Sequence, residues 1–324
     1  MVLTIVLYST IETEITHTQK PKSYLFLALK GILFIGVLVL LWFQLSNVKR
    51  DAWSSFGIEN PLAFFAAIIL VFPNLWLAYR KWKITLKTIG IESDQRRRMH
   101  SFFAGLVTGL LTPNMIGNFI GRFYYFNKKH RVNITAFTVL SNWGQFLASI
   151  TFGAVSVVWL GELIVWKDET SLFYVLLIVV IISYLFFFYV DNFLRFFKRL
   201  QFGVAFKYLL KKSPWFRTKV LFLSYARFVV FTLQFSLMLV AYGADWSWPL
   251  IAAIWQVYLL TMIAPSLILG KVGVKESIAL FVLSTLGISE VGILFSSLSI
   301  WFLNTVSPAL LGLIVCRNRK WKQS

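Results

Sequence analysis

The feature that most constrains this chain is a series of apolar runs long enough to cross a bilayer. About 20 apolar residues in a helix cross ~30 Å of hydrocarbon, and a helix satisfies its own backbone hydrogen bonds in lipid. Such runs lie at 24–46, 61–81, 133–164, 171–190, 220–242, 249–266 and 291–316. Shorter or broken apolar segments lie at 101–126 and 274–288. We therefore predict an all-α, polytopic integral membrane protein with about eight membrane segments.

Composition excludes a soluble domain and gives the positive charge a simple role. The chain is 58% hydrophobic and 14% charged, too few polar residues to cover a soluble surface. Its net charge of +19 would suggest nucleic acid in a soluble protein, but in a membrane protein basic loops face the cytoplasm and its anionic lipid. The single cysteine, Cys316, excludes an internal disulfide and a cysteine metal cluster.

Placing the basic clusters on the cytoplasmic side predicts a path through the membrane. Residues 1–23 form a cytoplasmic tail, 24–316 form one transmembrane domain, and 317–324 form a second cytoplasmic tail. Segment 101–126 has cations on both flanks, which favours a re-entrant segment that dips in and returns. The basic and aromatic stretch 191–219 is predicted to be an amphipathic connector on the inner surface.

On this path the two halves of the domain run in opposite senses. Repeat one covers about 24–164 and repeat two about 171–316, so the pattern predicts an inverted-topology repeat. Segment 249–288 allows two readings, since it either crosses fully or re-enters from outside. Either reading leaves the C-terminus in the cytoplasm.

A motif that occurs twice supports this duplication. Thr112 to Arg122 reads TPNMIGNFIGR, and Ala264 to Glu276 reads APSLILGKVGVKE. The prolines Pro113 and Pro265 are 152 residues apart. Each copy places a proline, two glycines and a cation in an apolar segment, where proline breaks a helix and glycine permits close approach. Paired interruptions of this kind point to a binding site between membrane repeats.

The charged residues of these motifs are the first candidates for substrate binding. Arg122 suits a phosphate, because its planar guanidinium can bond two oxygens at once, whereas an arginine that snorkels to the surface would be only an anchor. Lys275 and Glu276 either form a local ion pair or supply the opposite wall of a cavity. In the first motif Asn114 and the backbone at Gly117 would help to hold the phosphate.

Uncharged polar residues within the apolar runs complete the prediction. Amides in membrane helices usually form interhelical hydrogen bonds, but as a group they could line a groove for a lipid headgroup. The candidates outside the two motifs are Asn142, Gln145 and Gln256.

No pattern in the chain predicts catalysis. His17, His100 and His130 stand in basic loops or tails, and none begins an acyltransferase motif. No Asp-x-Asp pair or glycine-rich phosphate loop occurs. We expect a protein that is not an enzyme, with no metal and no cofactor.

The two motifs, together with Tyr79-Arg80-Lys81-Trp82, resemble the flippase-like family, the transmembrane region of lysylphosphatidylglycerol synthases. The resemblance implies a multi-pass protein of the inner, cytoplasmic membrane that moves a lipid between leaflets. The predicted site on the motifs comprises Pro113, Asn114, Gly117, Asn118, Gly121, Arg122, Arg80, Pro265, Gly273, Lys275 and Glu276. Family members usually carry an acid where this chain has Asn118, and often a base where it has Met115. The chain stops eight residues after Cys316, so synthase activity is not expected from it.

These observations predict translocation of an anionic phospholipid or a polyprenyl-phosphate-linked lipid. The alternatives are a secondary transporter of a small anion and a non-transporting scaffold for a separate lipid-modifying enzyme. The expected partners are anionic membrane lipids, without nucleic acid.

Overall fold

The computed structural model describes residues 42, 57–110, 112, 117–160, 169–196, 214–264 and 273–316. The predicted tails and, apart from Trp42, the predicted span 24–46 lie outside these residues. So do the middle of the predicted connector and three candidate site residues, Pro113, Asn114 and Pro265.

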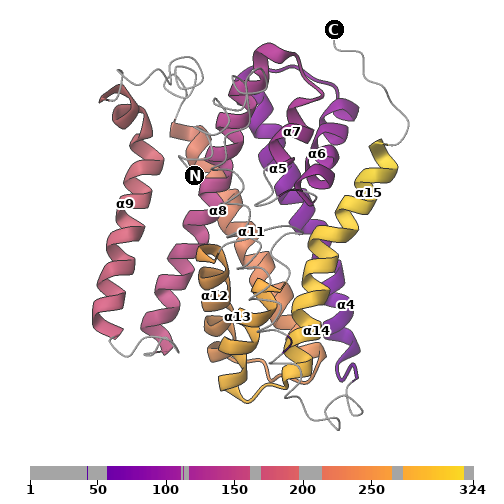
Figure 1. The fold of residues 1–324 in the computed structure, drawn as a ribbon, viewed down its shortest axis with the longest axis vertical. Helices are drawn as coiled ribbons and strands as arrows, with labels where there is room; N and C mark the ends of the chain where they lie inside the picture. Colours follow the sequence, from indigo (N-terminus) through magenta and orange to yellow (C-terminus); the bar gives the residue numbers. More distant parts are fainter. Residues whose placement is uncertain are drawn as a thin grey trace, which may run out of the picture.

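The described part of the chain is all-helical, as predicted, with no strand (Figure 1). Its elements are α4 (Pro61–Ile69), α5 (Val71–Ile89), α6 (Gln95–Leu110), α7 (Gly117–Phe123), η2 (Lys128–His130), α8 (Arg131–Leu160), α9 (Glu169–Phe196), α11 (Pro214–Ala241), α12 (Trp248–Ile263), α13 (Val274–Leu283), η3 (Ser284–Leu286), α14 (Glu290–Trp301), η4 (Phe302–Val306) and α15 (Ser307–Cys316).

Three helical stretches in the described residues are long and apolar enough to cross a membrane. They are Pro61–Ile89, Pro214–Ala241 and Glu290–Cys316, and two shorter apolar helices cover Phe173–Tyr189 and Trp248–Ile263. The first span is longer than the apolar run 61–81 that predicted it. Helices α6, α7 and α13 are 16, 7 and 10 residues long, so at 1.5 Å per residue each is shorter than ~30 Å of hydrocarbon.

Local sequence explains where these helices begin and bend. Asn60 caps α4 by accepting from the Ala63 N–H at 3.1 Å, and Gly90 ends α5 with φ of 83°. Pro73 lacks an N–H, and the break between α4 and α5 lies at Leu70, one turn earlier. Near the C-terminus, Pro308 comes two residues after a π-helical turn, Phe302–Val306, which is the second irregularity followed by a proline.

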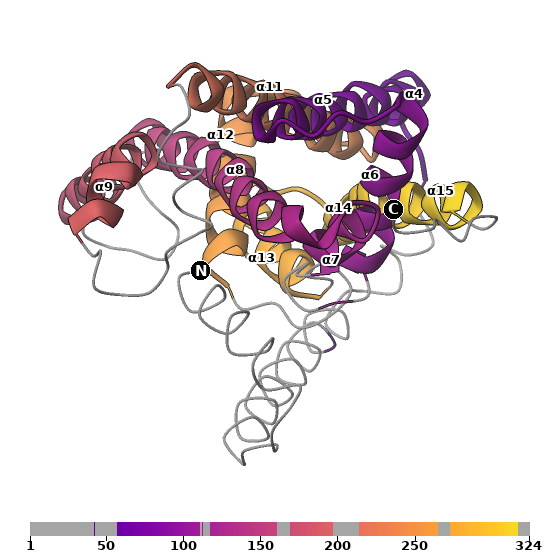
Figure 2. The ribbon, with the colours of Figure 1, turned by 90° about the horizontal axis from the view of Figure 1, so that it is seen from above.

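Helices α4 and α5 lie antiparallel beside α11 (Figure 2). Three hydrogen bonds show this direction, because residue numbers rise along α4 and α5 while those of their partners fall along α11. The bonded pairs are Ala67 with Gln234, Asn74 with Arg227 and Lys81 with Ser224. Two hydrophobic cores lie on this frame, one around Trp82 and Phe137 and one around Phe235 and Leu280.

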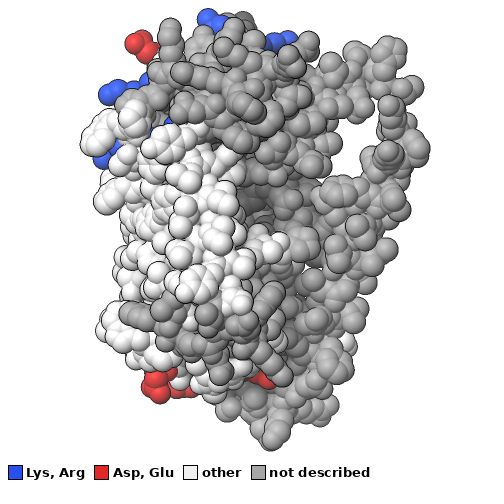
Figure 3. Space-filling view, turned by 90° about the vertical axis from the view of Figure 1, so that its left-hand side faces the viewer, with Lys and Arg blue, Asp and Glu red and all other residues white. Residues whose placement is uncertain are grey.

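The two interrupted helix pairs lie toward opposite ends of the molecule. In Figure 1 the α6–α7 pair is in the upper half and the α12–α13 pair in the lower half, while α9 lies at the outer edge. Among the charged residues coloured in Figure 3, Lys and Arg lie at the upper end together with some acidic atoms, and those at the lower end are Asp and Glu.

The predicted connector 191–219 is divided differently from expectation. Its first six residues continue α9 to Phe196, and α11 begins at Pro214. The stretch between, 197–213, is outside the described residues.

Candidate functional site

Glycines bring α6 and α7 into backbone contact and so position the first motif. An added Cβ at Gly117 would lie 2.2 Å from the carbonyl oxygen of Thr108, and one at Gly121 would lie 2.4 Å from that of Ala104. On the facing helix, a Cβ at Gly105 would meet the Arg122 side chain at 2.7 Å. Small residues four apart on both helices allow the close packing that is typical of membrane helix pairs.

Two threonines join the ends of this helical hairpin. The Thr108 hydroxyl donates to the Gly117 carbonyl oxygen at 2.5 Å, and the Gly117 N–H donates to the Thr112 hydroxyl at 2.6 Å. The first N–H of α7 is therefore bonded within the hairpin. The predicted phosphate contact at the Gly117 backbone would compete with this bond.

Arg122 leaves the hairpin toward the aromatic side chains of α5 and α6. Its guanidinium carbon lies 4.9 Å from the ring centre of Trp82 and 5.7 Å from that of Phe102. The Nε atom is buried and has no hydrogen-bond partner. The arginine is thus held by cation–π contacts, while its Nε–H has no acceptor among the described residues.

Lys81 is the second cation at this place. It lies in the middle of α5, is only 5% exposed, and donates from Nζ to the Ser141 carbonyl oxygen at 3.0 Å and to the Ser224 hydroxyl at 2.9 Å. Both acceptors are neutral. The lysine therefore links α5 to α8 and α11 without neutralising its charge.

Arg227 of α11 is the third cation, one turn after Ser224. Its Nε donates to Asn74 Oδ1 at 2.8 Å, and its guanidinium lies 4.9 Å from the Phe231 ring centre. Asn74 in turn donates to Asn304, and Asn304 donates to Gln234 at 2.7 Å. This chain of neutral amides connects Arg227 to two other helical segments, α5 and η4, and adds no negative charge.

We call Arg122, Lys81 and Arg227 the cation cluster. The charges of Arg227 and Arg122 both act on Lys81, and that of Arg227 acts on Arg122, so the three groups repel one another. No carboxylate among the described residues hydrogen-bonds to any of them. A single cation at membrane depth costs about 2.5–3.5 kcal/mol, so three together need a negative counter-charge.

The second motif is organised in another way. Glu276 is 1% exposed, and its two oxygens accept from the Gly273 N–H at 2.6 Å and the Ser297 hydroxyl at 3.0 Å. The carboxylate thereby caps α13, whose preceding Gly273 has φ of 83°. Lys275 lies over the rings of Phe235 and Tyr258, at 4.6 Å and 5.7 Å.

The remaining predicted site residues divide into two groups. Arg80 is exposed and its guanidinium lies 4.9 Å from the Trp76 ring centre, and Asn142 is also exposed. Three others have buried amide atoms without a hydrogen-bond partner: Oδ1 of Asn118, Oε1 of Gln145 and both polar atoms of Gln256. Gln145 lies one turn from Ser141, which binds Lys81.

Lys81 and Arg227 were not predicted as site residues from the sequence. Lys81 stands at the end of the predicted span 61–81, but α5 continues to Ile89 and buries it. Helical spacing carried a usable signal, because Asn74 and Lys81 are seven residues apart and share one face of α5. On α11, Ser224 and Arg227 share a face for the same reason.

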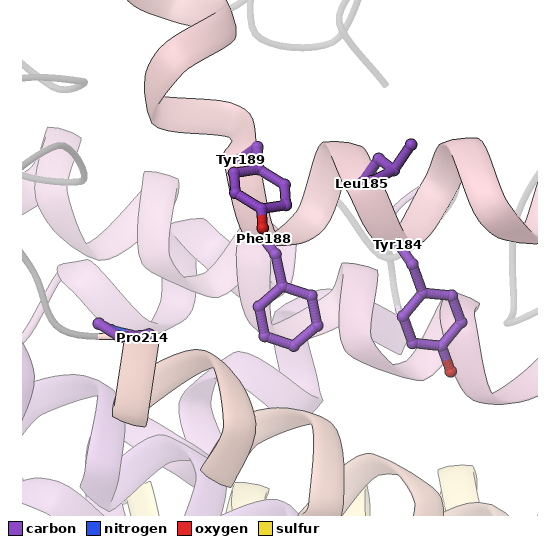
Figure 4. A pocket seen from close by; sticks show the side chains of 5 residues that line it. All are labelled: Tyr184, Leu185, Phe188, Tyr189 and Pro214. Carbon is purple, nitrogen blue, oxygen red and sulfur yellow. The ribbon is translucent and has the colours of Figure 1, made fainter.

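A hollow of about 280 Å³ is lined by none of the residues of the cation cluster. Figure 4 shows its lining, which is Tyr184, Leu185, Phe188 and Tyr189 of α9 and Pro214 of α11. The lining has no charged side chain. The hollow therefore suits an apolar chain rather than an ionic group.

Comparison with known proteins places this arrangement in a family context. The sequence profile of the lysylphosphatidylglycerol synthase TM region matches residues 27–312. No curated protein matches the chain. The matched range contains all the residues of the cation cluster and both motifs.

Proposed function

Because the chain belongs to the lysylphosphatidylglycerol synthase TM region family, we propose that it moves an anionic lipid between the leaflets of a membrane. The cation cluster would bind the negatively charged headgroup. The observation that carries the proposal is that Arg122, Lys81 and Arg227 converge from three helices with no carboxylate bonded to them among the described residues.

Unsatisfied polar atoms near the two motifs support a bound polar ligand. Buried polar groups in native proteins are nearly always hydrogen-bonded, and an exception calls for an explanation such as a ligand or water. Arg122 Nε and Gln145 Oε1 are such exceptions, and both lie close to residues that contact or flank Lys81. Phosphate oxygens can accept from the Arg122 Nε–H, and a hydroxyl group or a bound water can donate to Gln145 Oε1.

The fold also supports a path for the headgroup through the membrane. We propose that the α6–α7 and α12–α13 pairs are re-entrant, because α7 and α13 are too short to cross and the pairs lie toward opposite ends of the molecule (Figure 1). The antiparallel course of α5 and α11 fits two inverted repeats. Basic residues at one end (Figure 3) favour that end facing the cytoplasm.

The proposal assigns no catalysis, metal or cofactor to the chain, and places it in the cytoplasmic membrane. Among the described residues no group of three or more His, Cys, Asp or Glu side chains could hold a metal ion. Lys275, which lies on an aromatic pair, stays a predicted second wall of the pathway.

Translocation can be tested in liposomes. The purified chain is reconstituted with a trace of fluorescent phosphatidate or, in parallel, fluorescent phosphatidylglycerol, and a membrane-impermeant reductant bleaches the outer leaflet. Loss of more than half of the fluorescence, which requires movement from the inner leaflet, is expected with the natural chain. Arg122→Gln should slow this phase strongly, whereas Lys83→Gln, a change of an exposed cation on α5, should not.

The same liposomes separate the alternatives. Uptake of a small anion such as phosphate without lipid movement would favour a secondary transporter. If neither lipid nor anion moves, and the chain captures a lipid-modifying enzyme, the scaffold alternative would replace the proposal.

A further inference from the structure

The cation cluster carries more positive charge than one phosphodiester can neutralise. A phosphodiester headgroup such as that of phosphatidylglycerol has one negative charge, whereas a phosphate monoester has about −1.5 to −2 at pH 7. Arg122 and Arg227 carry two positive charges, Lys81 adds a third donor, and the described residues that accept hydrogen bonds from Lys81 and Arg227 are neutral. A ligand with one charge would leave an excess of positive charge in a poorly solvated place.

The geometry of the donors leads to the same conclusion. The three cations come from α7, α5 and α11, and Trp82, which follows Lys81 directly, lies under the Arg122 guanidinium. Ser224, which binds Lys81, lies one turn before Arg227. A terminal phosphate has three strong acceptor oxygens, which matches the number of these donor side chains, whereas a phosphodiester has two unsubstituted oxygens.

The described residues also lack a counter-group for a cationic headgroup. Glu276 is the only buried carboxylate among them, and both its oxygens are bonded, to Gly273 and Ser297. An aminoacylated lipid would bring its ammonium group toward three cations. The cluster therefore repels the charge that lysine adds to a phospholipid.

From these observations, and resting on the proposed function, we propose that the translocated lipid ends in a terminal phosphate. Its headgroup is a phosphomonoester or a diphosphate, such as that of a phosphatidate or a polyprenyl phosphate. Phosphodiester and aminoacylated headgroups are the disfavoured substrates.

The test compares binding of four lipids with identical short acyl chains to the full chain in detergent. They are phosphatidate, phosphatidylglycerol, phosphatidylcholine and lysylphosphatidylglycerol, and glycerol 3-phosphate tests the headgroup without a chain. At pH 7.5 phosphatidate should bind about tenfold tighter than phosphatidylglycerol, a modest gain for one further charge–charge contact. Phosphatidylcholine and lysylphosphatidylglycerol should bind more weakly than either.

The pH dependence sharpens the test, because the monoester has a second pKa near 6 and arginine remains charged throughout. The affinity for phosphatidate relative to that for phosphatidylglycerol should fall about threefold or more from pH 7.5 to pH 5, because the monoester gains a proton over this range. Phosphatidylglycerol serves as the control for titration of the protein.

Other titratable groups on helices packed near α5 have partners elsewhere. They are Arg97, Arg98 and His100 of α6, Arg131 of α8, and Arg217, Lys219 and Tyr225 of α11.

Variants connect the preference to the cluster. Arg122→Gln and Arg227→Gln should each reduce the preference for phosphatidate several-fold, and Lys83→Gln should retain it. Arg122→Lys keeps the charge but loses the planar guanidinium, so it should reduce the preference less than Arg122→Gln does. If Arg122→Gln misfolds, Arg227→Gln still tests the cluster.

Each outcome has a distinct meaning. Equal binding of phosphatidate and phosphatidylglycerol at pH 7.5 would overturn this inference and leave the proposed function standing. Binding of neither anionic lipid would contradict the proposed function itself. Glycerol 3-phosphate bound as tightly as phosphatidate would overturn the lipid assignment in favour of a soluble phosphate ester.

Discussion

The two proline–glycine motifs place a cation in similar surroundings but leave it in different electrostatic states. Arg122 lies on Trp82 and Phe102, and Lys275 lies on Phe235 and Tyr258. Arg122 stands among other cations, whereas the residue after Lys275 is a buried carboxylate. One copy therefore concentrates positive charge, and the other balances it.

This difference indicates a division of roles between the copies. In the second copy Glu276 satisfies the backbone at the start of α13 and binds α14 through Ser297. In the first copy neutral Thr108 and Thr112 do the structural bonding, and the arginine is left available. The second motif thus stabilises the fold, while the first can bind a ligand.

The largest effect that would test this division is on Glu276. Glu276→Ala should lower the free energy of unfolding by about 3 kcal/mol, since two buried donors lose a charged acceptor. Glu290→Ala, which removes an exposed acid from the first turn of α14, should cost about 0.5 kcal/mol. Chemical unfolding in detergent measures both, and equal small losses would show that Glu276 is not structural.

A smaller effect is expected at the close contact of the first hairpin. Gly117→Ala should destabilise the protein by about 2–3 kcal/mol, because the new Cβ meets backbone. Gly109→Ala, whose Cβ would meet the Asn118 Cβ at 3.3 Å, should cost less than about 1 kcal/mol. A reversed order of the two melting temperatures would contradict the packing described for α6 and α7.

Arg122→Gln should separate binding from stability. We expect anionic lipid affinity to fall by about 2 kcal/mol, roughly 30-fold, while unfolding changes little because repulsion in the cluster is relieved. Lipid titration and chemical unfolding of the same sample provide the two numbers. A loss of stability with unchanged affinity would assign Arg122 a structural role instead.

The smallest effect should be that of Lys275→Met. Loss of its cation–π contacts is expected to cost about 0.5–1 kcal/mol of stability. Affinity for anionic lipid should change less than in Arg122→Gln. A larger loss of affinity would place Lys275 in the binding pathway, as the sequence predicted, and would remove the contrast between the two motifs.

Much of the architecture could be read from local patterns. The helices around 61–89, 214–241 and 290–316 follow from apolar length, and their starts and ends follow from residues such as Asn60 and Gly90. The duplication of the motif also pointed to Arg122, whose buried Nε now lacks a partner. These features depend on neighbours in sequence, so sequence is enough to predict them.

The cation cluster could not be predicted in this way, because it forms from contacts between residues that are far apart in the sequence. Lys81 stands at the end of the predicted span 61–81, but the longer α5 buries it against Ser224, 143 residues away. Glu276 read as a possible ligand until its oxygens proved to be bonded to Gly273 and Ser297. Apolar length and motif spacing determined the helices and the family, whereas only tertiary packing decided which charges meet, because charge acts through distance in space and not along the chain.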